Sequence, residues 1–120
     1  MLKYVLREVV AFVTFKERKV NKINRNKKYE RMYQAIISLK TLEECEMFFD
    51  DLCTVTELQA MEQRFHVAEC LSKGMIYNDI LTETGASSAT ISRVNRSLQY
   101  GKGGYDVVFP RLNGEEEADK

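Results

Sequence analysis

A chain of 120 residues is long enough for one domain with its own hydrophobic core. Its 18 Lys and Arg balance 18 Asp and Glu, and a composition with one proline and six glycines indicates a soluble, mainly helical protein. Three cysteines without a C-x-x-C pair, together with a single histidine, argue against a zinc site or a disulfide framework, so we expect reduced thiols in the cytoplasm.

Residues 1–28 differ from the rest of the chain in charge and pattern. The opening MLKYVLREVVAFVTF contains Glu8 and is shorter than the ~20 apolar residues of a membrane-spanning helix, and it lacks the cleavage site of a signal peptide. The polar stretch KERKVNKINRNKK follows, and residues 1–31 carry ten Lys and Arg against three Asp and Glu. We therefore predict a loosely ordered basic arm over residues 1–28 and no membrane partner.

Three consecutive helices are predicted between residues 29 and 74. In YERMYQAIISL, apolar residues recur every three or four positions, as on one face of a helix. The stretches TLEE and TVTE have the spacing of capping boxes, in which a hydroxyl and a carboxylate satisfy free helix amides. We expect helices to follow Thr41 and Thr54, the second of them ending before Gly74. The fold class is therefore all-α.

A shorter helix over MIYNDILTET, a glycine, and another helix over ASSATISRVNRSLQY come next. Ile80, Gly85, Ile91 and Val94 have the separations expected where two helices cross around a glycine turn. This pattern is typical of a helix-turn-helix, whose second helix presents its first residues to a DNA groove. We place that reading helix at about residues 87–98. The alternative is a helical hairpin in which the serines only cap the helix.

Small side chains at the start of the reading helix allow close approach to base edges, and arginines farther along neutralise phosphates. Double-stranded DNA is thus the expected partner. The candidate DNA-binding residues are Asn78, Ser87, Ser88, Ala89, Thr90, Ser92, Arg93 and Arg96. The basic stretch at residues 16–31 is a further candidate for contact with DNA.

The end of the chain carries a glycine-rich joint, YGKGG, and an acidic terminus. We predict a flexible joint and then a short final helix that ends at Pro110. We predict that residues 113–120, with the sequence NGEEEADK, form a disordered acidic tail.

The run DLCTVTELQAMEQRFHVAECLSKG, followed by ILTETGASSATISRVNRSLQYG, resembles the Trp repressor family, especially its YerC/YecD-type branch. The resemblance covers residues 29–112. It implies a multi-helix fold, an intertwined homodimer with one helix-turn-helix per subunit, and a transcriptional regulator of the repressor type.

The same resemblance implies a pocket for a small-molecule corepressor. Arg64 and Arg93 align with arginines that flank the ligand in the family, and guanidinium groups stack on aromatic rings and bind carboxylates. The candidate pocket residues are Thr54, Arg64, Thr90, Arg93 and Ser97. An unidentified ligand, or none, is favoured over tryptophan, which can be tested directly.

The sequence shows no pair of carboxylates with a nearby base, no metal-binding cluster and no activated nucleophile, so it does not predict an enzyme. The second class of function is a protein–protein interaction module. In that interpretation the acidic helix near residues 43–51, EECEMFFDD, binds a basic partner, and the helix-turn-helix is only a scaffold.

Overall fold

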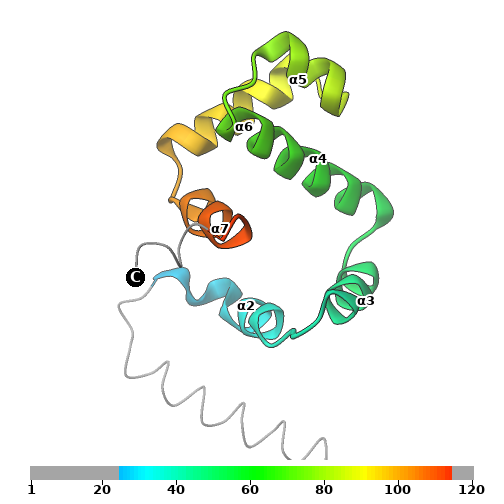
Figure 1. The fold of residues 1–120 in the computed structure, drawn as a ribbon. Helices are drawn as coiled ribbons and strands as arrows, with labels where there is room; N and C mark the ends of the chain where they lie inside the picture. Colours follow the sequence, from blue (N-terminus) through cyan, green and yellow to red (C-terminus); the bar gives the residue numbers. More distant parts are fainter. Residues whose placement is uncertain (1–24, 115–120) are drawn as a thin grey trace, which may run out of the picture. The chain divides into compact units, whose positions relative to one another are not determined.

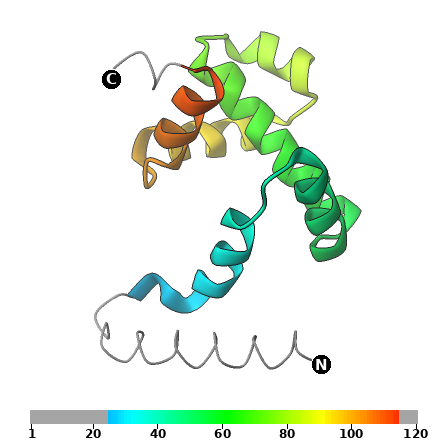
Figure 2. The same cartoon turned by 60° about the horizontal axis from the view of Figure 1, so that its bottom comes forward.

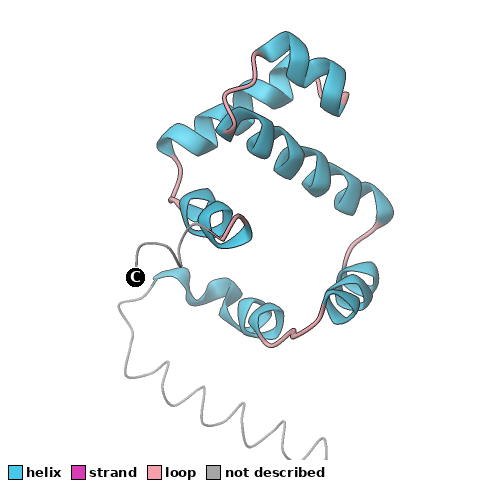
Figure 3. Cartoon of the chain, in the orientation of Figure 1, coloured by secondary structure: helices cyan, strands magenta, loops and turns pink. Residues whose placement is uncertain are grey.

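The computed structural model describes residues 25–114, and all regular structure in this range is helical (Figures 1 and 3). The predicted all-α class is therefore confirmed. The predicted basic arm and acidic tail lie almost entirely outside the described residues. The chain divides into two compact units, residues 1–46 and 47–120.

The described part of the first unit contains a 3-10 helix, η1 (Arg25–Tyr29), then α2 (Glu30–Ile37) and the first half of α3 (Leu42–Leu52). No residue of α2 is buried, and Ile37 is 82% exposed. At the start of α3, the Glu44 N–H donates to Thr41 Oγ1 at 3.0 Å, as the sequence predicts. The Glu44 carboxylate accepts from the Lys40 N–H at 2.9 Å instead of from Thr41, so the second bond of the predicted box is displaced by one residue.

The second unit contains the end of α3 and four more helices: α4 (Val55–Ser72), α5 (Tyr77–Thr84), α6 (Ser88–Tyr100) and α7 (Gly104–Leu112). The predicted capping box at Thr54 is present in full, and α4 ends before Gly74, which has a φ of +82°. Helices α5 and α6 both pack against α4 and against each other (Figures 1 and 2).

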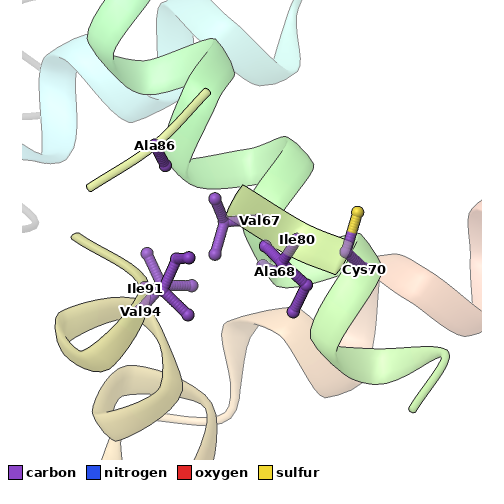
Figure 4. Close-up of a cluster of buried hydrophobic side chains, with 7 residues drawn as sticks. All are labelled: Val67, Ala68, Cys70, Ile80, Ala86, Ile91 and Val94. Atoms are coloured by element: carbon purple, nitrogen blue, oxygen red, sulfur yellow. The ribbon is translucent and has the colours of Figure 1, made fainter. Parts of the chain in front are cut away.

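The buried core of this unit belongs to the helix-turn-helix and to the helix that supports it (Figure 4). Its members come from α4, α5, the turn and α6: Val67, Ala68, Cys70, Ile80, Ala86, Ile91 and Val94. Ile80, Ile91 and Val67 are completely buried. Burying one such side chain stabilises a fold by roughly 1.5–3 kcal/mol, so this cluster fixes α5 and α6 on α4.

Helix α7 is longer than predicted, since it continues past Pro110 to Leu112. Proline removes one amide donor, but the next turn still forms, with the Asn113 N–H donating to the Phe109 carbonyl at 3.0 Å. The Phe109 ring stacks on Tyr105 and lies 5.6 Å from the ring of Phe65 on α4. This aromatic packing holds the part of α7 that precedes the proline on α4.

Candidate nucleic-acid interface

A tight turn between α5 and α6 sets the start of the reading helix. Gly85 ends α5 with a φ of +69°, a left-handed conformation that favours glycine, and its N–H donates to the Leu81 carbonyl. The Thr84 hydroxyl donates to the Ile80 carbonyl at 2.7 Å and accepts from the Ala86 N–H at 3.1 Å. The side chain of Ala86 is only 3% exposed and belongs to the buried core, so the turn packs against that core.

The first turn of α6 divides the predicted DNA-binding residues into two groups. Ser87 is the N-cap and accepts from the Thr90 N–H at 3.2 Å, while the two hydroxyls lie 3.1 Å apart. Ser88, Ala89 and Ser92 are exposed, and neither exposed serine makes a side-chain hydrogen bond within residues 25–114. Ser87 and Thr90 therefore shape the helix end, whereas the other three face solvent.

Two arginines extend the exposed face of α6. Arg93 and Arg96 are exposed, and neither forms an ion pair within the part of the chain that the structure describes. Ile91 and Val94 occupy the opposite, buried face, and α6 contains no acidic residue. Asn78, in the first turn of α5, is exposed as well. The predicted interface thus combines small side chains with positive charge.

Within one chain, Thr54 lies apart from Arg64 and Ser97, two of the other candidate ligand residues. Thr54 lines a groove of about 530 Å³ beside Asp50 and Glu62. Ser97 lines a different groove of about 480 Å³, whose walls include the rings of Phe65 and Tyr105. Arg64, Arg93 and Thr90 line neither groove. Ten residues of helix separate Thr54 from Arg64, a distance of about 15 Å along α4.

Sequence reasoning missed two contacts between α4 and the end of α5. Gln63 Nε2 donates to the Thr84 carbonyl at 3.4 Å, and His66 Nε2 lies 3.9 Å from Glu83 Oε1. Along the chain, the carboxylates nearest to His66 are those of Glu62 and Glu69, one turn away on the same helix. No local pattern reveals a partner 17 or more residues away, so only the fold brings these groups together.

Cys70 is 4% exposed, and Cys45 and Cys53 are half-buried. Burial raises the pKa of the Cys70 thiol, and the negative charge of Glu83 raises it further. Residues 25–114 contain no group of three or more His, Cys, Asp or Glu arranged to hold a metal ion. None of the described helices has the length and apolar character needed to cross a membrane.

The fold and the exposed end of α6 define a helix-turn-helix protein. Residues 27–113 match the family model of the Trp repressor protein, so the chain belongs to the Trp repressor family. YerC of Bacillus subtilis (strain 168), itself an uncharacterized protein, is 50% identical over 92 residues, which are 77% of this chain and 88% of YerC. The crystal structure of a TrpR like protein from Eubacterium eligens ATCC 27750 is 53% identical and has a TM-score of 0.70, covering 78% of this chain and 95% of that one.

Proposed function

We propose that this protein is a sequence-specific transcriptional repressor that reads the DNA major groove with α6 as a homodimer. The observation that carries the proposal is the exposed face at the start of α6. That face combines three small side chains, Ser88, Ala89 and Ser92, with two arginines that have no ion-pair partner among residues 25–114.

Each property of this face suits DNA. Small side chains let a helix end approach base edges, where hydroxyls donate or accept hydrogen bonds and the Ala89 methyl can touch a thymine methyl. Arg93 and Arg96 neutralise phosphates, and counterions released from DNA then favour binding. Asn78 on α5 lies on the helix that crosses the DNA backbone in this motif.

Homodimer formation is supported by apolar side chains that one chain leaves in solvent. In the first unit, Ile37 and Leu42 are 82% and 76% exposed. In the second unit, Val55 and Leu112 are 73% and 62% exposed. A second copy that covers such residues would gain hydrophobic stabilisation. Two reading helices would then enter successive major grooves, with half-site centres ~34 Å apart.

Modulation by a small ligand is part of the same proposal. Thr54 and Arg64 are separated by about 15 Å along α4, so one chain does not assemble all five candidate residues. In a dimer, a second chain can supply Thr54 to a pocket formed by Arg64, Thr90, Arg93 and Ser97. Guanidinium groups at such a pocket favour a flat ligand with a carboxylate.

The test of the proposal is selection of bound duplexes from a random DNA pool by the purified protein near physiological salt. We expect enrichment of a two-fold symmetric sequence, first without and then with added tryptophan. The chain contains no tryptophan, so fluorescence of the added amino acid reports its binding directly. A folded dimer that enriches no sequence under either condition would contradict sequence-specific repression controlled by tryptophan or by no ligand.

A protein–protein interaction module is the second candidate. Helix α3 exposes Glu43, Glu44 and Glu46 beside Met47, which is 66% exposed. Acidic and apolar groups on one helix suit a basic, partly apolar partner. Replacing the three glutamates by Gln should abolish binding of such a partner and leave DNA affinity unchanged. Partner binding that survives this change would contradict the interaction-module interpretation.

A further inference from the structure

The acidic end of the chain and the arginine face of α6 carry opposite charges. Residues 115–120, with the sequence EEEADK, contain four carboxylates and one lysine, and they lie outside the described residues. Arg93 and Arg96 are exposed on α6, which has no acidic residue. Neither arginine forms an ion pair or a side-chain hydrogen bond within residues 25–114. Two unpartnered guanidinium groups and a run of carboxylates thus belong to the same compact unit, residues 47–120.

The fold brings the start of this acidic tail close to the arginines. Ser97 on α6 and Val108 on α7 line the same groove, so these two positions lie near each other. Arg93 lies one turn before Ser97 on the same side of α6, and Leu112 lies one turn after Val108 at the end of α7. Each turn adds a rise of only ~6 Å along its helix. Because six residues of extended chain span up to ~20 Å, the tail is long enough to reach both arginines.

Both ends of this contact are fixed to α4. Ile91 and Val94 hold α6 in the buried core, and the ring of Phe109 on α7 lies 5.6 Å from the ring of Phe65. A short flexible tether between fixed points keeps its charges at a roughly millimolar effective concentration near their target. Ion pairs too weak to join separate molecules are then populated within one chain.

We propose that residues 115–119 dock on the Arg93 and Arg96 face of α6 in the free protein and that DNA displaces them. Carboxylates and phosphates bind guanidinium groups in the same forked geometry, so the tail and DNA compete for one surface. The effect on DNA affinity rests on the proposed function, whereas the docking can be measured on the free protein. Since exposed ion pairs are weak, the tail should lower DNA affinity by about three- to tenfold.

Two variants of the full chain with the same change in net charge test the proposal. The tail variant replaces the four tail carboxylates by amides: Glu115→Gln, Glu116→Gln, Glu117→Gln and Asp119→Asn. The control variant removes four exposed carboxylates of α3 that form no ion pair within the described residues: Glu43→Gln, Glu46→Gln, Asp50→Asn and Asp51→Asn. Only the first variant removes the groups proposed to dock.

The first experiment follows the side-chain NMR resonances of Arg93 and Arg96 without DNA. We expect these resonances to shift in the tail variant and to stay at their wild-type positions in the control variant. The difference between the tail variant and the wild type should disappear at about 1 M salt, where the Debye length is only ~3 Å. Arginine resonances that are the same in the wild type and the tail variant would overturn the proposal. Shifts confined to Lys27, Lys28 and Arg31 would also overturn it, because the tail would then contact the basic stretch at residues 16–31.

The second experiment measures affinity for a selected duplex near physiological salt. The tail variant should bind about three- to tenfold more tightly than the wild type, and the control variant should bind like the wild type. Equal gains in the two variants would overturn the proposal, since net charge alone would then explain them. If the wild type binds no duplex, the proposed function fails, and the arginine resonances alone decide whether the tail docks on α6.

Discussion

Thr54 and Glu57 exchange two hydrogen bonds at the start of α4. The Thr54 N–H donates to Glu57 Oε1 at 2.8 Å, and the Glu57 N–H donates to Thr54 Oγ1 at 3.1 Å. This reciprocal pair satisfies two amides that helix geometry would leave without acceptors. Since α4 carries Val67, Ala68 and Cys70 into the core, the pair fixes where the supporting helix of the helix-turn-helix begins.

Thr54→Ala should destabilise the protein by about 1 kcal/mol, because the Glu57 N–H loses the hydroxyl oxygen that accepts its hydrogen bond. Chemical denaturation followed by circular dichroism measures the change in the free energy of unfolding. Thr56→Ala is the matched control, since Thr56 is exposed in the first turn of α4 and its side chain makes no hydrogen bond within the described residues. Equal losses in the two variants would contradict a capping role for Thr54.

The capping pair should also make stability depend on pH. Hydrogen bonds from the Thr54 N–H and then from its hydroxyl lower the pKa of Glu57 below its ordinary value of 4.5. A lowered pKa in the folded state contributes stability above the unfolded pKa, and that stability is lost as pH falls through the folded pKa. The difference in unfolding free energy between the wild type and Glu57→Gln should therefore shrink as pH falls from 6 to 3. A constant difference over this range would argue against an ionised cap.

Gly85→Ala should destabilise the protein by about 1 kcal/mol through backbone strain alone. A methyl group at this position would meet no atom within 4 Å, but the φ of +69° is unfavourable for alanine. Gly104→Ala is the matched control, because a methyl group there also meets no atom within 4 Å and Gly104 is not among the glycines with a positive φ. That change should be neutral or slightly stabilising. Thermal unfolding of both variants separates the two effects.

Features that depend on neighbours in the chain could be predicted from the sequence. The capping box at Thr54 needs a hydroxyl and a carboxylate three residues apart, and the turn at Gly85 needs a residue that tolerates positive φ. Ile80, Ile91 and Val94, assigned from spacing to the crossing of two helices, are all in the buried core. Each of these inferences depends on short-range geometry.

Features that depend on tertiary packing could not be predicted. The ring of Phe109 on α7 packs on Phe65 of α4, which is distant in sequence, so no local pattern could predict this contact. Likewise, Glu83 is the charged partner of His66 only because the fold brings α5 onto α4. The candidate ligand residues align with a family pattern, but an alignment does not give the distance between Thr54 and Arg64. A local motif gives no distances between helices.

Cys70 should react with thiol reagents more slowly than Cys53 in the native protein. Cys70 is 4% exposed and its thiol has a raised pKa, so little thiolate is present at pH 7, whereas Cys53 is half-buried. Brief alkylation followed by mass spectrometry of the peptides gives the order of modification. Alkylation in denaturant is the control, since unfolding removes burial and both thiols should then react at similar rates. Preferential labelling of Cys70 in the native state would contradict its place in the core.

Ser88→Glu should weaken binding to a selected duplex by at least about tenfold, which corresponds to ~1.4 kcal/mol. The exposed side chain of Ser88 is at the first position of α6, where a carboxylate would face phosphates and base acceptors. The same carboxylate favours the helix itself, because it lies at the positive end of the helix dipole, so the protein should remain folded.

Ser72→Glu adds the same charge at the last residue of α4, on a different helix, and is the control for a change in net charge. Fluorescence anisotropy with a labelled duplex measures both affinities, and the salt dependence of binding should be similar in the wild type and Ser72→Glu. If the two substitutions weaken binding equally, the start of α6 is not in the groove. An affinity for the duplex that Ser88→Glu leaves unchanged would likewise contradict docking of the start of α6 in the groove.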